Sequence, residues 1–138
     1  MASITQWQSS LQGATWIDIN SLFTMNTLPD RLPDSLSIQY GSIYNLFNCS
    51  IGQRSRTFQP QYGMMWKEFL QEPIDNITAT KMQIGMLQAL ARWEPRITVD
   101  VANSYVTPDL SLPGYQVQIA FMLNLTSQRQ AVSFAVTT

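Results

Sequence analysis

The sequence predicts an α+β fold, with helices packed on a C-terminal antiparallel β-meander. Apolar residues recur at helical spacing between positions 34 and 93, which indicates amphipathic helices. Between positions 97 and 136 apolar and polar residues alternate instead, which indicates strands with one buried face. A chain of 138 residues is long enough to bury one sizeable core, so we expect a single main domain.

The beginning of the chain is interpreted as an N-terminal arm. Its apolar residues follow no sustained period, and a short strand is expected near residues 15–19. Two prolines mark residues 28–33 as a turn or linker. We therefore divide the chain into an arm over residues 1–33 and a domain over residues 34–138.

Two helices are expected next. The first begins at Asp34 or Ser35, both favourable capping residues, and runs to about residue 48. The second covers about residues 64–71 and ends before Pro73, because the residue before a proline avoids the helical region. The apolar face predicted for the first helix is Leu36, Tyr40, Ile43 and Phe47.

A third helix is expected to begin near Asn76 or Thr78 and to end at about residue 93, before Pro95. Methionines on such a stripe are typical core residues, because their flexible side chains fill irregular gaps. The predicted core stripe is Met82, Met86, Ala89, Leu90 and Trp93.

The last third is expected to form the antiparallel meander. The alternating runs lie at about residues 97–105, 116–125 and 131–136. The connections, residues 107–114 and 126–130, are short enough to join antiparallel neighbours.

Composition narrows the possible functions. Only 12% of residues are charged, against roughly 25% in an average soluble domain, which suggests that partner proteins cover part of the surface. The absence of histidine removes Ser-His-Asp and Cys-His catalysis and the commonest metal ligand. A single cysteine, Cys49, allows neither an internal disulfide nor a thiolate zinc cluster. We therefore expect no cofactor and no metal ion.

Two further classes of partner are not expected. The charge is balanced and no stripe of Lys and Arg exists, which argues against direct nucleic-acid binding. No apolar run approaches about 18 residues, so no membrane span is predicted.

The charged corner Glu94-Pro95-Arg96 stands where the third helix ends and the first strand begins. A negative charge at a helix C-terminus is unfavourable by a few tenths to about 1 kcal/mol, so Glu94 needs a compensating contact. Two explanations stay open. Glu94 forms an ion pair with Arg92 or Arg96, or Glu94 and Arg96 form a rigid corner, fixed by Pro95, that docks on another subunit.

A loop is expected at residues 50–63. Arg54 and Arg56 in this loop are either ordinary solvated charges or contacts to an acidic partner surface, because arginine suits interfaces. Phe58 and Tyr62 are expected to pin the loop to its own domain.

These two segments carry a family resemblance. A helix that ends in Glu-Pro-Arg before an alternating strand resembles the phage baseplate wedge proteins historically labelled lysozyme-like, a group that includes the type VI secretion subunit TssE. Family members also carry a segment close to Gly-x-Arg-Pro-Phe-x-Pro-x-Phe-Gly. The matching positions of this chain are Arg56, Phe58, Pro60, Tyr62 and Gly63, with tyrosine in place of phenylalanine at position 62.

The resemblance implies a structural role in the baseplate of a contractile tail. It implies that the protein is a virion component assembled in the host cytoplasm, and that it links the wedge to the sheath and initiates sheath assembly. The implied partners are other wedge subunits, the sheath subunit and tube or hub proteins. It assigns Glu94, Pro95 and Arg96 to wedge docking. The residues that we predict to make loop contacts are Arg54, Arg56, Phe58, Pro60, Tyr62 and Gly63.

The final run of the sequence fits such a role independently. Residues 130–138 alternate and contain no charge, proline or glycine, although monomeric proteins use such residues to blunt a sheet edge. Either a neighbour's strand completes the sheet here, or the strand is interior or covered. The residues assigned to strand addition are Ala131, Val132, Ser133, Phe134, Ala135 and Val136.

Two alternatives remain. The older family label suggests a glycosidase, which needs two facing carboxyls with one raised pKa. Glu68 and Glu72 could share a helical face, but nothing indicates a cleft between them. We therefore expect that the protein is not an enzyme. The other alternative is the equivalent subunit of a type VI secretion baseplate, with the same fold and different neighbours. The carboxyl candidates are Glu68, Glu72, Asp75, Glu94 and Asp100.

Overall fold

A computed structural model describes residues 17–19, 31–33, 36–53, 58–69, 71–111 and 113–137. The chain forms two compact units, Met1–Asn45 and Leu46–Thr138, which we describe separately. The arm boundary predicted after residue 33 stays a prediction. Most of the arm, the predicted helix start at Asp34 or Ser35, and the loop residues Arg54 and Arg56 lie outside the described residues.

In the first unit, β1 (Ile17–Ile19) pairs antiparallel with β2 (Arg31–Pro33). β1 confirms the short strand predicted near residues 15–19. The linker predicted for residues 28–33 is wrong at its end, because its last three residues form β2. Pro33 is compatible with this strand because it lies at the end of a two-stranded ribbon, opposite Ile17.

A helical segment follows, made of the π-helix η1 (Ser37–Ile43) and the α-helix α3 (Tyr44–Asn48). The predicted helix is therefore present, but its predicted apolar face is partly wrong. Ile38 and Leu46 are 0% and 1% exposed, whereas Leu36 and Tyr40 are only half-buried. The reason is that i→i+5 hydrogen bonds widen each turn, which rotates the buried face away from the 3.6-residue spacing.

In the second unit, α4 (Trp66–Phe69) is shorter than predicted, while α5 (Asn76–Trp93) has the predicted length. The capping residue of α5 is Asp75 rather than Asn76 or Thr78: its Oδ1 accepts a hydrogen bond from the Thr78 N–H at 2.7 Å. This bond favours the ionised carboxylate and lowers the pKa of Asp75.

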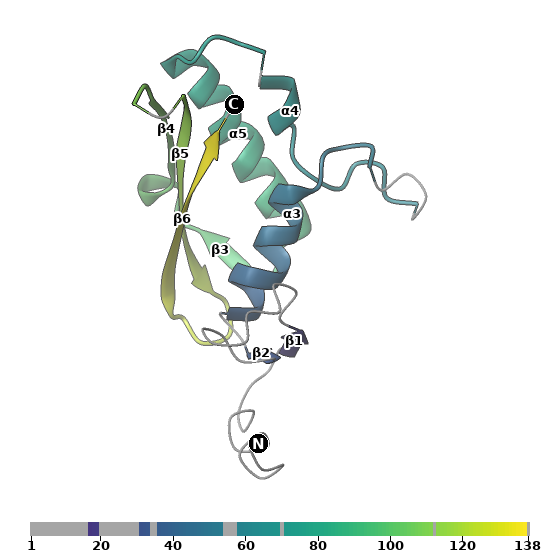
Figure 1. The fold of residues 1–138 in the computed structure, drawn as a ribbon. Helices are drawn as coiled ribbons and strands as arrows, with labels where there is room; N and C mark the ends of the chain where they lie inside the picture. The colour runs from purple at the N-terminus through teal and green to yellow at the C-terminus, as the bar shows by residue number, and fades with distance from the viewer. Residues whose placement is uncertain are drawn as a thin grey trace, which may run out of the picture. The chain divides into compact units, whose positions relative to one another are not determined.

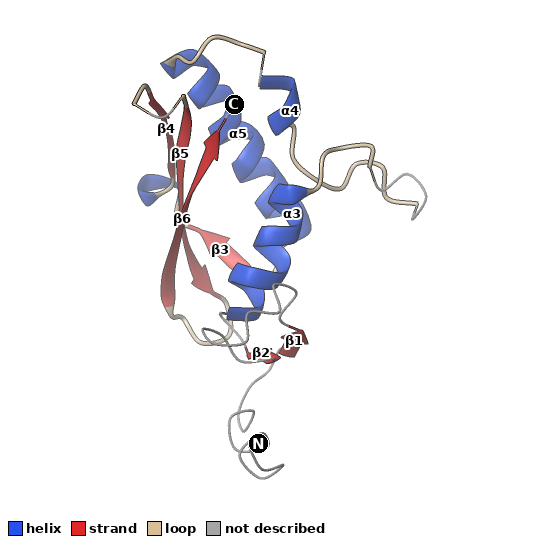
Figure 2. Cartoon of the chain, viewed as in Figure 1, coloured by secondary structure: helices blue, strands red, loops and turns tan. Residues whose placement is uncertain are grey.

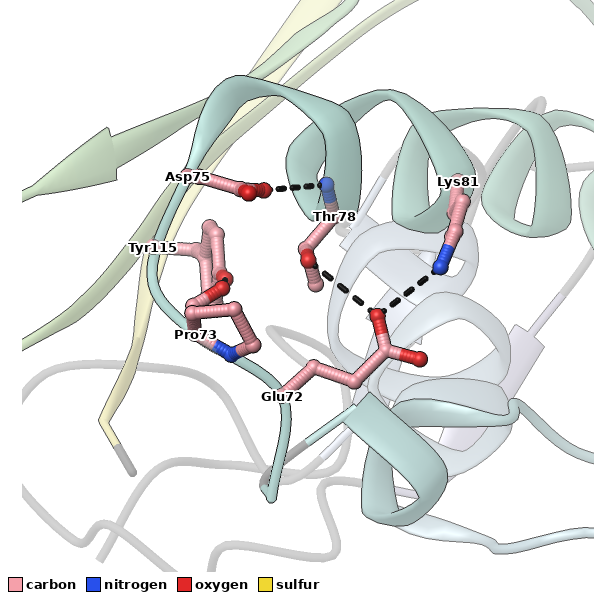
Figure 3. A network of polar contacts seen from close by, with 6 residues as sticks. All are labelled: Glu72, Pro73, Asp75, Thr78, Lys81 and Tyr115. Atoms are coloured by element: carbon pink, nitrogen blue, oxygen red, sulfur yellow. Dashed lines mark hydrogen bonds and ion pairs between the residues drawn. The ribbon is translucent and has the colours of Figure 1, made fainter.

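A polar network holds the segment between α4 and α5 (Figure 3). Glu72 accepts hydrogen bonds from the Thr78 hydroxyl at 3.1 Å and from Lys81 Nζ at 3.0 Å. The Tyr115 hydroxyl donates to the Pro73 carbonyl at 3.3 Å. The network connects the start of α5 both to the preceding turn and to the sheet.

The sheet is antiparallel and has four strands (Figures 1 and 2). They are β3 (Ile97–Val99), β4 (Tyr105–Asp109), β5 (Gly114–Leu123) and β6 (Arg129–Thr137). β5 is central: β3 and β4 pair with successive parts of one side, and β6 pairs along the other. The α+β prediction is confirmed.

The core of this unit lies between α5 and the sheet, where α5 contacts β3 and β4. Met82, Met86 and Leu90 are at most 2% exposed, which confirms that the methionine stripe is core. From β5, alternate residues face the same core and are equally buried: Tyr115, Val117, Ile119, Phe121 and Leu123.

The first predicted strand is interrupted. The 3-10 turn η3 (Val101–Asn103) separates β3 from β4, and Asp100 caps it by accepting from the Ala102 N–H at 3.2 Å. The interruption shifts the alternation, so Val106 is buried while Tyr105 is 43% exposed. The predicted continuous run over residues 97–105 is therefore wrong, because a side-chain-capped turn replaces its middle.

Candidate functional site

The last strand lies at an edge of the sheet. Among the strands that the structure describes, only β5 pairs with β6, and it does so over the whole of Arg129–Thr137. The register runs from Met122 opposite Arg129 to Gly114 opposite Thr137 without a skipped residue, so β6 contains no bulge. The condition that strand addition requires, an edge position, is met.

The two edges of the sheet differ. The edge opposite β6 consists of β3 and β4, which are three and five residues long and are separated by η3. β4 also contains Pro108, which has no N–H to offer. Short strands and proline are devices that blunt an edge. β6 is nine residues long, roughly 30 Å at about 3.4 Å per residue, and has none of them.

The hydrogen bonds around β5 reveal which backbone groups of β6 are open. The Leu123 N–H donates to the Gln128 carbonyl at 3.0 Å, on the side of β6, whereas the Asn124 N–H donates to the Arg96 carbonyl at 3.1 Å, on the side of β3. Backbone groups alternate sides along a strand. The N–H and C=O groups of the odd-numbered residues of β5 therefore point to β6, and those of the even-numbered residues point to β3 and β4. The Ala120 carbonyl, which accepts from the Asp100 N–H at 2.8 Å, agrees with this assignment.

The register carries this alternation over to β6. Ile119 of β5 lies opposite Val132, and Val117 lies opposite Phe134, so the even-numbered residues of β6 bond to β5. The odd-numbered residues direct their N–H and C=O groups to the open edge, where no described strand meets them. Ala131, Ser133 and Ala135, which belong to the predicted strand-addition set, lie in the middle of this row, and Arg129 and Thr137 lie at its ends.

The side chains of β6 are small on one face and incompletely covered on the other. Ala131, Ser133 and Ala135 are exposed, whereas Val132 and Phe134 are half-buried and face the core. The Phe134 ring packs edge-on against Phe47, with 4.9 Å between ring centroids and an interplanar angle of 80°. Ile119 and Val117, directly opposite on β5, are 0% and 1% exposed. The apolar face is thus closed over β5 and remains partly open along β6.

The charged corner is an ion pair in the structure. Arg96 Nε lies 2.6 Å from Glu94 Oε1 and Nη2 lies 2.7 Å from Oε2, which is a bidentate contact. The Glu94 side chain is 3% exposed and that of Arg96 is 29% exposed. Glu94 caps α5, and the guanidinium compensates its charge there. Of the two charged groups in this corner, Arg96 is therefore the one that faces solvent in part, next to the exposed Pro95.

Asn124, which the sequence analysis did not single out, fixes the corner from the other side. Its Nδ2 donates to the Pro95 carbonyl at 3.0 Å, and its backbone N–H donates to the Arg96 carbonyl. Its Oδ1 accepts from the Thr98 hydroxyl at 2.6 Å. In the sequence, a polar residue after a long strand is typical of a turn. Only the pairing of the strands reveals that Asn124 holds the charged corner.

The structure brings the two resemblance segments into contact. The Tyr62 ring packs edge-on against Trp93 of α5, with 5.3 Å between centroids, and Arg92 donates to the Gln61 side chain. Trp93 directly precedes Glu94, so the loop is attached next to the charged corner. Tyr62 pins the loop, as predicted.

Gly63 allows the chain to pass closely at this point. Its φ is +123°, and a Cβ there would lie 2.2 Å from the Cys49 carbonyl oxygen. The Met64 N–H donates to that same oxygen at 2.9 Å, which closes the base of the loop. Only glycine fits, because any side chain would collide with backbone.

Phe58 does not pin the loop, and this prediction is wrong. Its side chain is 94% exposed and its φ is +59°. For a residue other than glycine this left-handed conformation is unfavourable by about 1–2 kcal/mol. It directs the ring away from the domain. Pro60 is also exposed, and its carbonyl accepts from the Gly52 N–H at 2.7 Å.

The carboxylates do not form a glycosidase pair. Glu72 binds Lys81, Glu94 binds Arg96, and Glu68 lies exposed on α4. Asp75 and Asp100 cap turns, and their pKa values are lowered, chiefly by the backbone hydrogen bond from Thr78 and the side-chain hydrogen bond from Asn103. A general acid needs a raised pKa instead.

The described residues also contain no group of three or more His, Cys, Asp or Glu side chains that could hold a metal ion. In the same part of the chain, no helix combines the length and hydropathy needed to cross a bilayer.

Comparisons with known proteins identify relatives of this fold. The family model described as baseplate wedge protein gp25 matches residues 35–131. A crystal structure of a candidate tail lysozyme from Geobacter sulfurreducens has a similar fold, with a TM-score of 0.61 and 20% identity over 70% of this chain and 84% of that chain.

One curated protein is also similar. The 3-isopropylmalate dehydrogenase of Moorella thermoacetica is 33% identical over 103 residues, which cover 70% of this chain. The chain spans only 29% of the length of that protein.

Proposed function

The chain belongs to the gp25 family of baseplate wedge proteins, and from this membership we propose that it links the wedge of a contractile tail to the sheath and initiates sheath assembly. Its role in the baseplate is structural. In the proposal, a strand of the first sheath subunit pairs with β6 and completes the sheet. The observation that carries the proposal is the open edge at Ala131, Ser133 and Ala135, on a strand that has no proline and no bulge and whose one charged residue, Arg129, lies at its first position.

The incomplete cover of β6 supports the same partner. A strand added at the edge would satisfy the outward N–H and C=O groups and would shield the half-exposed flank of Val132 and Phe134. The opposite edge cannot serve equally well. Pro108 lies opposite Tyr115, an odd-numbered residue of β5, so its missing N–H is one that would have faced outward.

Docking to the other wedge subunits is assigned to the corner Glu94, Pro95 and Arg96. Because Glu94 is almost fully buried, its part in the proposal is to hold the guanidinium of Arg96 in place, and Arg96 makes the contact. In the proposal, the protein is a non-enzymatic virion component that is assembled in the host cytoplasm, and tube or hub proteins are further neighbours. The type VI secretion baseplate remains the second candidate setting, because its subunit shares the family resemblance.

The test uses proline substitutions at adjacent positions of β6. Ser133→Pro removes an N–H that faces the open edge, so the protein should fold with nearly unchanged stability. Baseplates that contain it should carry no sheath, as seen by electron microscopy of assembled tails. Ser133→Ala keeps the N–H and should support normal sheaths.

Val132→Pro is the matched control, because it places proline at the adjacent position, whose N–H points to β5 and not to the open edge. It removes an N–H that bonds to β5, so it should lower the free energy of unfolding by about 1–3 kcal/mol. If Ser133→Pro baseplates nucleate complete sheaths, strand addition at this edge is wrong. Turnover of purified peptidoglycan by the wild-type protein would instead support the glycosidase alternative.

A further inference from the structure

We propose that Phe58 is an anchor side chain that inserts into an apolar pocket, edged by carboxylates, on a neighbouring wedge subunit. Phe58 is the most exposed of the large hydrophobic side chains in the described part of the chain, at 94%. Aromatic side chains that insert into a partner's pocket supply a large share of the energy of protein interfaces. The proposal rests on the wedge membership and adds a contact that neither β6 nor the charged corner provides.

The backbone holds this ring outward. Phe58 keeps a left-handed φ of +59°, a conformation that persists only where the surrounding chain enforces it. Two hydrogen bonds hold the residues that follow Phe58: the Gly52 N–H donates to the Pro60 carbonyl at 2.7 Å, and the Tyr62 N–H donates to the Gln59 carbonyl at 3.2 Å. The segment directly after Phe58 is therefore held by the chain itself.

The base of the loop is attached to a rigid element. Ser50 bridges to Met64, Tyr62 packs on Trp93, and Gln61 accepts from Arg92. Residues that are held in place before binding lose less conformational entropy in the complex. Because Trp93 precedes Glu94, the anchor and the charged corner emerge from the same end of α5, which favours one common partner, a wedge subunit.

The positive charge of the loop indicates that the margin of the partner's pocket is acidic. Residues 50–63 contain two arginines and no acidic residue, and Arg92 is exposed at the base of the loop. A complementary surface is apolar at its centre and acidic at its margin.

The experiment measures binding of the full chain to purified wedge complexes assembled without it. Phe58→Ala should weaken binding by roughly tenfold to a hundredfold and leave the melting temperature unchanged. Leu110→Ala is the matched control: Leu110 is 82% exposed in the turn between β4 and β5, and its removal should not change binding. Phe58→Gly separates backbone from ring, because it relieves the positive φ and should still lose binding.

Unchanged binding by Phe58→Ala would overturn the proposal. Loss of self-association in sedimentation, with wedge binding intact, would identify a second copy of this chain as the occupant and would also overturn it. If the wild-type protein itself fails to bind wedge complexes, the wedge-docking function fails, whereas loss confined to Phe58→Ala and Phe58→Gly supports the anchor.

Discussion

At the scale of single residues, the ion pair at the end of α5 limits how the charged corner can be tested. Glu94 is 3% exposed and Arg96 is 29% exposed. Truncating one member of such a pair leaves a buried charge without its partner. A loss of tail assembly in Arg96→Ala would therefore mix docking with stability, and Arg96→Lys, which keeps the charge but not the bidentate geometry, is the better probe of docking.

We expect Arg96→Ala to lower the free energy of unfolding by about 2–3 kcal/mol, somewhat less than for a fully buried pair because Arg96 is partly solvated. The double variant Glu94→Gln/Arg96→Ala should lose less than Arg96→Ala alone, because no charge is left stranded. Urea unfolding of the variants measures this. Equal stability of Arg96→Ala and wild type would mean that the pair does not form in solution.

Gly63 provides a second residue-level prediction. Gly63→Ala should lower stability by about 2–3 kcal/mol, because it adds a collision with the Cys49 carbonyl to a positive φ. Gly52→Ala is the control: its φ of +91° is also positive, but nothing lies within 4 Å of the added Cβ. It should therefore lose only about 1 kcal/mol. Equal losses in thermal unfolding would contradict the close approach.

At the scale of elements, two capping aspartates make the stability of the turns that they cap depend on pH. Asp75 caps α5 and Asp100 caps η3, and hydrogen bonds lower the pKa of each below its usual 3.8. A folded-state pKa below the unfolded value means that the contribution is complete above the unfolded pKa and is lost as the pH falls through the folded pKa.

Stability should therefore decline as the pH falls below about 4, with a shallower decline in Asp75→Asn. Asparagine keeps the capping oxygen and removes the titration, so it isolates the charge from the cap. Urea unfolding between acidic and neutral pH measures the slope. A slope identical to that of the wild type would show that Asp75 does not contribute.

The elements also differ in how well the sequence predicts them. The span of α5 and the alternation of β5 follow local periodicity and agree with the structure. The break at η3 and the π-helical turns of η1 do not, because each depends on hydrogen bonds that the hydrophobic pattern does not encode.

At the scale of the whole molecule, we propose a structural role with two kinds of contact. One is the open edge of β6, and the other is the end of α5, where the loop and the charged corner meet. The two contacts are separable in experiment, since Ser133→Pro addresses the sheath and Phe58→Ala addresses the wedge.

Sequence periodicity and the two short segments were enough to predict the α+β class, the helix α5 and the family, because these features are local along the chain. They were not enough to place β6 at an edge, to orient Ala131, Ser133 and Ala135 outward, or to turn Phe58 into solvent. Those properties depend on which strand pairs with which and on where a loop is held. Such choices are made by contacts between residues far apart in sequence, so they emerge only when the chain is folded.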